Sequence, residues 1–257
     1  MSNGHDEIRS NSEFPFFKEQ NWDAYTPEDH QVWSLLFERR MEELEKTVSK
    51  AYLVGADRIA LTAEFVPDLG AINHKLEPIT GWQTLPVNGF IPKGPFFDCL
   101  SRRLFPTTTI VRTMEQLEYL PEPDIFHDVF GHVPMHANKD FAEFLAAFGR
   151  LAATFDDPVC AEAFARLFWF TVEFGLILED GDIRIYGSGL ISSSGDAANA
   201  LGSQCTRRPF VLDEVIEQSF EIDQFQDVLF VIESFDQITG AVEELGNRFS
   251  RARSMNI

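Results

Sequence analysis

The sequence of 257 residues has few cysteines, few basic residues and no apolar segment at its N-terminus. Its three cysteines, Cys99, Cys160 and Cys205, lie far apart and form no C-x-x-C pair, which argues against a disulfide scaffold and a structural zinc module. Lys and Arg number 21 against 41 Asp and Glu, so the formal net charge is -20. Such a surface repels phosphate and anionic lipid, and we expect no nucleic-acid or membrane partner. The polar N-terminus lacks the apolar core of a secretory signal, so we expect a cytoplasmic protein.

Phenylalanine is abundant in this sequence, with 25 residues against 4 Trp and 4 Tyr. Hydrophobic residues make up 44% of the chain, which is enough for a buried core and excludes a wholly disordered protein. Phe packs into cores without a polar atom that needs a partner, so the excess fits a Phe-rich interior. It fits an aromatic-lined pocket equally well, and composition does not distinguish the two.

Capping residues and apolar periodicity predict a mainly helical chain. The run Thr26-Pro27-Glu28-Asp29 has an N-cap, a proline at the first helical position and acidic residues in the first turn. Apolar residues then recur at mostly three- and four-residue steps up to Leu44, which indicates one helical face. Three further helices are predicted to begin at Asn138, at Asp157 (running to about Leu178) and, from a capping box, at Ser234 (ending near Arg251).

Little sheet is expected. Asp180-Gly181, followed by alternating isoleucines, predicts a short hairpin, and residues 228–235 predict a strand. Residues 66–95 are rich in Pro and Gly, so we expect a long irregular stretch there rather than long regular elements. The sequence therefore predicts a flexible tail over residues 1–15 and one domain over residues 16–257, mainly α with a small amount of β.

Half of the six histidines fall within ten residues, as His127, His132 and His136. A five-residue step on a regular α-helix separates His127 and His132 by about 140°, whereas the zinc-protease motif H-E-x-x-H uses four residues to place both rings on one face. Gly131 and Pro134 indicate a broken or distorted helix, which could bring both rings to one point. Clustered histidines are typical of a metal site, but surface and capping histidines are an open alternative. We interpret His136 as a non-ligand.

A single carboxylate in an apolar segment is a candidate third ligand. Residues 163–178 carry only two charges, Arg166 and Glu173, and a helix that is apolar on every side belongs in a core. A desolvated Glu173 needs a cation, because an unpaired buried carboxylate is costly. Pairing with Arg166 or Arg112 is one solution, and a metal held together with the two histidines is another. Two imidazoles and one carboxylate form the facial triad of non-haem iron oxygenases, whereas zinc on the same ligands would favour hydrolysis with Asp128 as base.

Three runs in this sequence resemble the signature blocks of the pterin-dependent aromatic amino acid hydroxylases. They are PDIFHDVFGHVP at residues 123–134, WFTVEFGL at 169–176 and IYGSGLISS at 185–193, in the family's order and spacing. The resemblance covers roughly residues 15–250 and is closest to the short bacterial phenylalanine 4-hydroxylases. It implies the fold of that family's catalytic domain. The regulatory domain and tetramerisation helix of the animal members have no counterpart in this sequence, so we expect a monomer.

The resemblance implies an iron(II)- and tetrahydropterin-dependent monooxygenase that converts the small-molecule substrate L-phenylalanine to L-tyrosine with O2. His127, His132 and Glu173 match the family's iron ligands and form its catalytic centre. The positions that match its substrate-binding residues are Arg112, Asp124, Pro123, Trp169, Phe174, Gly189 and Ser192. Those that match its pterin-binding residues are Phe96, Ile91, Asp128, Ala165 and Phe168.

Some of these matches carry a specific role, and some leave a simpler alternative. Arg112 matches the arginine that pairs with the substrate carboxylate, a role suited to its bidentate fork. Asp124 matches the aspartate that orients this arginine, although it also fits an ordinary turn residue. Ser192 matches a serine that supports an iron-bound histidine. For Phe96 and Ile91, plain core packing is an open alternative to pterin contact.

The sequence departs from the family pattern at three positions. Phe168 replaces a common Tyr beside the metal, Leu120 stands where animal members have Thr, and Ser188 replaces the Ala of Y-G-A-G-L. These departures leave open hydroxylation at another ring position, or of tryptophan or tyrosine. Tryptophan hydroxylases usually carry Phe where this chain has Trp169, which disfavours indole substrates. A zinc hydrolase and a catalytically silent binding protein are rivals from other classes.

Overall fold

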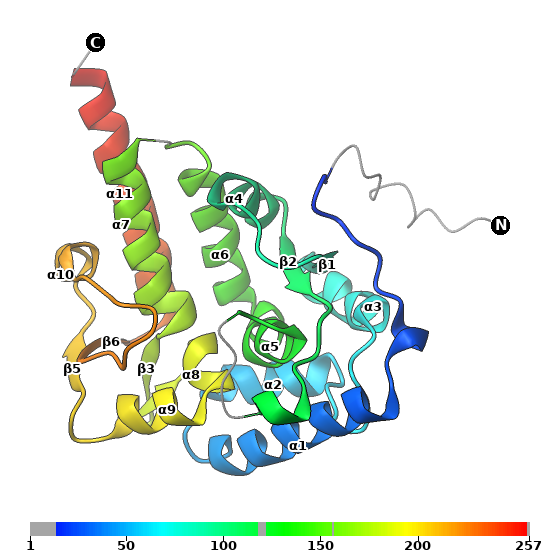
Figure 1. Cartoon of the computed structure of the whole chain (residues 1–257). Coiled ribbons are helices and arrows are strands. Elements are labelled where there is room, and N and C mark those ends of the chain that lie inside the picture. The colour runs from blue at the N-terminus through cyan, green and yellow to red at the C-terminus, as the bar shows by residue number, and fades with distance from the viewer. Residues whose placement is uncertain (1–13, 118–121, 156, 256–257) are drawn as a thin grey trace.

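Helices make up most of the residues that the computed structural model describes, which are 14–117, 122–155 and 157–255 (Figure 1). The α-helices are α1 Pro27–Leu44, α2 Lys50–Arg58, α3 Leu69–Thr80, α4 Lys93–Ser101, α5 Val133–His136, α6 Lys139–Ala152, α7 Pro158–Phe168, α8 Ser188–Ser192, α9 Ser194–Leu201, α10 Leu212–Glu217 and α11 Phe235–Met255. The strands are β1 Gln83–Val87, β2 Leu104–Thr108, β3 Leu176–Glu179, β4 Asp182–Ile185, β5 Thr206–Pro209 and β6 Val228–Ile232. Two short 3-10 helices, η1 Trp22–Ala24 and η2 Met114–Gln116, and two π-helical segments, η3 Phe126–His132 and η4 Trp169–Glu173, complete the described elements. The mainly α fold class with a small amount of β is confirmed.

Two small sheets accompany the helices. β1 and β2 pair in parallel, and the other sheet has the strand order β4-β3-β6-β5. β3 and β4 form the predicted antiparallel hairpin, and its turn residues Asp180 and Gly181 both have positive φ, 54° and 89°. Two positive φ values match the twist of the flanking strands, which explains the Asp-Gly signal. The strand predicted over residues 228–235 is confirmed as β6, which ends at Ile232.

Three of the four predicted caps begin their helices as expected, whereas at the start of α11 Gln237 Oε1 accepts the Glu233 N–H rather than the Ser234 N–H of the predicted capping box. Thr26 and Asp29 form a reciprocal capping box at the start of α1. The Asn138 side chain accepts a hydrogen bond from the Phe141 N–H at the start of α6. The Asp157 side chain accepts two backbone N–H groups at the start of α7. Each cap satisfies donors that the first helical turn leaves without a partner.

Two predicted helix ends are wrong. The helix expected to reach Leu178 ends as an α-helix at Phe168, and the π-helical segment η4 and then β3 follow it. The apolar run 163–178 suits a buried helix and a buried strand alike, so periodicity alone could not locate the change. The last helix, α11, continues past Arg251 to Met255.

Residues 66–95 are regular, so the predicted long irregular stretch is wrong. They contain α3, β1 and the start of α4. Asp68 caps α3 by accepting two backbone N–H groups, and Gly81 ends it in a left-handed conformation with φ 75°. Pro78 lies in the last turn of α3, where it removes one intrahelical hydrogen bond. The Pro and Gly residues therefore mark the ends of short elements and do not prevent them.

Phenylalanine fills the interior, as one interpretation of the composition proposed. α6 runs through the middle of the molecule and packs against α4 and α11 (Figure 1). Phe14 is buried in a smaller cluster beside β1, while residues 1–13 of the predicted tail lie outside the described residues. Among the described residues, no helix combines the length and apolarity needed to cross a bilayer. The fully buried Phe residues are Phe126, Phe130, Phe141, Phe144, Phe148, Phe164, Phe170 and Phe230.

A close approach of α2 to α5 supports the segment that follows the histidines. A Cβ added to Gly55 of α2 would lie 1.9 Å from the carbonyl oxygen of Pro134 in α5. We therefore expect Gly55→Ala to lower the free energy of unfolding by about 1–3 kcal/mol, measured by urea denaturation. Gly240→Ala in α11 is the matched control, because a Cβ there would meet no atom within 4 Å. Helix propensity predicts that the control gains about 0.5–1 kcal/mol. Equal stability of Gly55→Ala and the unmodified protein would contradict this packing.

Candidate metal centre

His127 and His132 lie on the π-helical segment η3, and this geometry brings their rings together. In a π-helix the hydrogen bonds join residues five apart, so residues with that spacing return to the same side. The two Nε2 atoms are 3.3 Å apart. The expected helix distortion is confirmed, but it is a widening of the whole turn rather than a break at Gly131 or Pro134. Gly131 has a different use, because a Cβ there would lie 3.0 Å from the Ser188 carbonyl oxygen of α8.

Glu173 ends the second π-helical segment, η4, and faces the two histidines. A five-residue hydrogen bond from the Phe174 N–H to the Trp169 carbonyl oxygen, 2.8 Å long, closes this segment. Glu173 Oε1 lies 3.3 Å from His132 Nε2, and Oε2 lies 3.7 Å from His127 Nε2. One ligand atom from each of the three residues lies within 4.8 Å of the others, and in the described part of the chain they are the group that could hold a metal ion.

The arginines considered as partners of Glu173 have other contacts. Arg166 pairs with Glu162 of α7, and Arg112 pairs with Asp124. Burial opposes ionisation of Glu173, but the imidazoles of His132 and His127 and a hydrogen bond from Ser188 outweigh it and lower its pKa to about 2. Glu173 is therefore an ionised carboxylate at neutral pH.

A serine on α8 fixes which nitrogen of His127 carries the proton. Ser192 Oγ donates its only proton to the Ser188 carbonyl oxygen at 2.9 Å. Its contact with His127 Nδ1, also 2.9 Å, must then be a hydrogen bond donated by the Nδ1–H. The Nε2 of His127 keeps its lone pair and faces Glu173 and His132. The expected contact between Ser192 and His127 therefore fixes the tautomer of the His127 ring.

The donor set fits a divalent transition metal. Two imidazole nitrogens and one ionised carboxylate converge, and the ring nitrogen of His127 is free to coordinate. This combination is typical of non-haem iron, and zinc accepts the same ligand types. Three protein ligands leave further coordination positions for small molecules.

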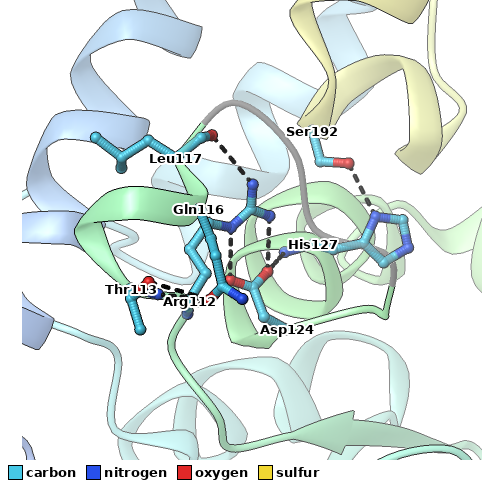
Figure 2. Close-up of polar contacts among 7 residues, drawn as sticks. All are labelled: Arg112, Thr113, Gln116, Leu117, Asp124, His127 and Ser192. Carbon is cyan, nitrogen blue, oxygen red and sulfur yellow. Dashed lines mark hydrogen bonds and ion pairs between the residues drawn. The ribbon is translucent and has the colours of Figure 1, made fainter.

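Arg112 and Asp124 lie beside His127 and are joined by two hydrogen bonds (Figure 2). Arg112 Nε and Nη2 donate to the two carboxylate oxygens of Asp124 at 2.8 and 3.0 Å. Asp124, fully buried, also accepts the backbone N–H of His127 at 3.1 Å, and a weaker contact joins Arg112 Nη1 to the Leu117 carbonyl oxygen. In the described part of the chain these contacts leave one N–H on each terminal nitrogen of Arg112. The guanidinium is thus oriented, and its two remaining terminal N–H groups can bind a further carboxylate in a bidentate way.

Three stacked aromatic rings stand next to Glu173. Trp169 stacks on Phe174 with a centroid separation of 4.6 Å and on Phe220 with 4.5 Å. Gly189 faces this stack, because a Cβ there would lie 3.1 Å from the Phe174 ring. Pro123 is exposed, directly before Asp124. The structure therefore brings Trp169, Phe174 and Gly189 together, and sequence reasoning missed Phe220.

The predicted pterin-binding residues form a looser group. Phe96 meets Phe168 edge to face at 5.6 Å, and it also packs on the small cluster that contains Ile91. Asp128 is buried beside His127 and accepts the Thr108 N–H at 2.7 Å. Burial raises the pKa of Asp128, against the opposing effect of His127. The list is completed by Ala165, half-buried on α7 three residues before Phe168.

Residues 18–256 match the model of a family described as biopterin-dependent aromatic amino acid hydroxylase. The chain belongs to this family. The match extends over most of the chain rather than over one short motif, which agrees with the resemblance seen in the sequence.

Several relatives of the hydroxylase family cover most of this chain. A phenylalanine-4-hydroxylase of Chromobacterium violaceum is 40% identical over 86% of this chain and 75% of its own length. One from Caulobacter vibrioides is 37% identical over 93% of this chain and 82% of its own. Among solved structures, the C. violaceum enzyme with bound iron(III) and oxidised 7,8-dihydrobiopterin has a TM-score of 0.87 at 38% identity, covering 93% of this chain and 88% of that one. The enzyme of Legionella pneumophila has a TM-score of 0.84 at 34% identity, covering 90% and 92%.

Sequence reasoning about the hydroxylase site also missed a buried arginine. Arg40 of α1 is 4% exposed and donates to the carbonyl oxygens of Leu190 and Ile191 at 3.1 and 2.9 Å. Its charge therefore anchors the last turn of α8, where carbonyl groups point outward. No local signal marks this role, because Arg40 and α8 are about 150 residues apart. Leu120, one of the three family departures, lies outside the described residues.

His136 is buried behind the hydroxylase site and is not part of the triad. Its ring stacks on Trp82 at 4.7 Å and lies 4.8 Å from the Phe105 ring. Neither ring nitrogen has a hydrogen-bond partner among the described residues. Burial, with a smaller contribution from His132, holds the pKa of His136 well below its usual range. His136 is therefore neutral in the folded protein at neutral pH.

We expect His136 to make the protein sensitive to mild acid. The unfolded chain binds a proton at His136 below about pH 6.5 and the folded protein does not, so stability is lost as pH falls through that range. Urea denaturation of the metal-free protein at pH 7, 6 and 5 measures this. His136→Leu should reduce the slope by about 1.4 kcal/mol per pH unit below pH 6. His74→Leu, at an exposed histidine, should not change it. Equal slopes in all three proteins would contradict a neutral, buried His136.

We expect iron(II) to stabilise the folded protein through the triad. At 100 times its dissociation constant, a ligand specific for the folded state adds about 2.7 kcal/mol. Thermal unfolding under anaerobic conditions, with and without iron(II), measures this gain. Glu173→Ala should lose most of the gain, and Glu162→Ala, at an exposed carboxylate of α7, should keep it. A gain that survives Glu173→Ala would place the metal elsewhere.

Proposed function

We propose that this protein is an iron(II)- and tetrahydropterin-dependent monooxygenase that hydroxylates L-phenylalanine to L-tyrosine with O2. The convergence of His127, His132 and Glu173 within 4.8 Å is the observation that carries the proposal. The phenylalanine-4-hydroxylases similar to this chain support it, since one of their structures contains iron and dihydrobiopterin. Family membership favours this oxygenase over a zinc hydrolase on the same ligands.

The metal would be held by His127 Nε2, His132 Nε2 and the Glu173 carboxylate. When bound, iron(II) and the reduced pterin supply the electrons that activate O2. The chain's own contribution is to fix the ligands and leave positions open for small molecules. Ser192 holds His127 in the required tautomer, and Ser188 donates a hydrogen bond to Glu173.

Arg112 binds the carboxylate of the amino acid substrate. Asp124 takes two of the five N–H donors of Arg112 and so fixes the plane of its guanidinium. The remaining terminal N–H groups form a fork that matches a carboxylate. Because Asp124 also accepts the His127 N–H, the substrate anchor and a metal ligand share one buried support. This link sets the distance between the bound carboxylate and the metal.

The aromatic stack receives the substrate ring. Trp169 and Phe174 form its inner part, and Phe220 supports Trp169 from behind. A flat apolar wall of this kind suits a phenyl ring and excludes water from the reacting position. Gly189 lets the chain pass close to Phe174, and Pro123 contributes from the turn before Asp124. We assign phenylalanine as the substrate on this basis, and the similarity to phenylalanine-4-hydroxylases supports the para position.

The reduced pterin binds on the side of Phe96 and Phe168. Both rings are half-buried and offer an aromatic surface, with Ile91 in the same cluster. Ala165, one turn before Phe168, leaves room beside it. Asp128, next to His127 in the chain, accepts the Thr108 N–H of β2, and its carboxylate can accept further hydrogen bonds from a bound pterin or water.

The protein acts on small molecules as a cytoplasmic monomer. The formal charge of -20 disfavours a nucleic-acid or membrane-surface partner, and the absence of a paired-cysteine pattern fits a reducing compartment. The monomer follows from the resemblance to the short bacterial members. Light scattering coupled to gel filtration tests it, and a stable dimer or tetramer would contradict it.

The proposed reaction is tested by product analysis. The protein, loaded with iron(II) without oxygen, is mixed with tetrahydropterin, O2 and L-phenylalanine, and the products are identified by mass and retention time. We expect para-tyrosine, lost in His132→Ala and kept in the exposed control His74→Ala. Meta-tyrosine would contradict the assigned ring position. No hydroxylated amino acid, with iron demonstrably bound, would contradict the function.

The role of Arg112 is tested by removing its fork while keeping its charge. Arg112→Lys should raise KM for phenylalanine about 10- to 100-fold, because a lysine cannot bind Asp124 and a substrate carboxylate in the same bidentate way. The value of kcat should change less, since the lost contacts are made in the bound ground state as well. Arg150→Lys, at an exposed position of α6, is the control. An unchanged KM in Arg112→Lys would contradict the assignment.

A further inference from the structure

The hydroxyl group of Ser188 lies between the metal centre and the backbone of η4. Ser188 Oγ is 2.7 Å from Glu173 Oε2 and 3.2 Å from the Val172 carbonyl oxygen. The side chain is buried, with 1% of the residue exposed. A serine hydroxyl has one proton, so it can donate fully to only one of these two acceptors.

The proton belongs to the Glu173 carboxylate. Hydrogen bonds from a hydroxyl to an ionised oxygen are shorter and stronger than those to a neutral carbonyl, and 2.7 Å is within their usual range. Ser188 therefore holds Oε2, the carboxylate oxygen that lies farther from a histidine nitrogen.

Holding one oxygen fixes the rotation of the carboxylate. The last torsion of a glutamate side chain is broad, so a carboxylate without a second contact can rotate over a wide range. With Oε2 bound to Ser188, Oε1 stays turned toward His132 Nε2 at 3.3 Å. From this geometry we infer that Ser188 is a positioning residue, which orients Glu173 as a metal ligand before the metal arrives.

The position of Ser188 itself is well determined. It begins α8, and Ser192 at the end of the same helix holds His127, so one short helix supports two of the three ligands. Neighbouring glycines allow α8 to come this close, because a Cβ on Gly187 would lie 2.4 Å from the Glu173 carbonyl oxygen. Arg40 anchors the other end of the helix. Hydroxyl and carboxylate therefore have little freedom to move apart.

Ser188 is also one of the positions where this chain departs from the family it resembles. Alanine, the residue expected there, has no hydroxyl and could not make this contact. The chain thus adds a hydrogen bond to a ligand carboxylate instead of only filling space. The inference rests on the proposed metal role of Glu173 and adds a residue that tunes it.

The test compares cobalt(II) binding in two serine variants. Ser188→Ala removes the hydrogen bond to Glu173. Ser194→Ala is the matched control. Ser194 Oγ also donates a hydrogen bond to a carboxylate, that of Glu43, at 2.8 Å, but this pair is exposed. Cobalt(II) affinity is measured by calorimetry, and the visible absorption of the bound ion reports its ligand environment.

We expect Ser188→Ala to weaken cobalt(II) binding about 10-fold and to change the visible spectrum, because loss of such supporting contacts typically costs 10- to 100-fold. Ser194→Ala should match the unmodified protein in both. Ser188→Gly, which also lacks the hydroxyl group, should behave like Ser188→Ala and replaces it if the alanine variant does not fold. Unchanged affinity and spectrum in these variants would overturn the inference, even if the protein makes tyrosine. No cobalt(II) binding by the unmodified protein would overturn the proposed function as well.

Discussion

A carboxylate packed against two imidazoles, with 16% of its side chain exposed, is the constraint on which the rest of this structure depends. Glu173 remains ionised next to His127 and His132, so the three groups together attract positive charge into an apolar interior. A regular α-helix would have turned the two histidines apart, and α7 continued without change would have carried Glu173 to another direction. Both ligand-bearing segments are π-helical, and this wider winding converts an unfavourable spacing into a shared site.

The surrounding fold serves to keep these three groups in place. α8 supports Glu173 through Ser188 and His127 through Ser192, and Arg40 of α1 holds its last carbonyl groups. Close contacts at Gly131, together with the Phe-rich core around α6, leave the helix little room to shift. Asp124 ties Arg112 to the backbone of His127, so the proposed anchor for a substrate carboxylate and the metal site share one buried support. The rigidity of the site is therefore a property of several elements distant in sequence.

Local chemistry explains which features could be predicted from the sequence. Caps such as Thr26 and the Asp-Gly turn act within a few residues, and two of the three family blocks carry the ligands at recognisable spacings. The end of α7 was missed because residues 163–178 are apolar in both the helix and β3. Contacts between remote segments leave no signal in the sequence. Examples are the hydrogen bond from Arg40 to α8 and the stacking of Phe220 on Trp169, which form only when the chain folds. For residues 66–95 the sequence predicted too little regular structure. Pro and Gly end short elements there but do not prevent them.

The most direct test of the account is anomalous X-ray diffraction at the iron edge from crystals loaded with iron(II) without oxygen. The account predicts one strong peak per chain, bonded to His127 Nε2, His132 Nε2 and the Glu173 carboxylate. The same maps show whether Ser188 Oγ remains within hydrogen-bond distance of the carboxylate oxygen that is not turned toward His132. Iron bound by other residues, or by His136 in place of one of these three, would contradict the assignment of His127, His132 and Glu173 as the metal ligands.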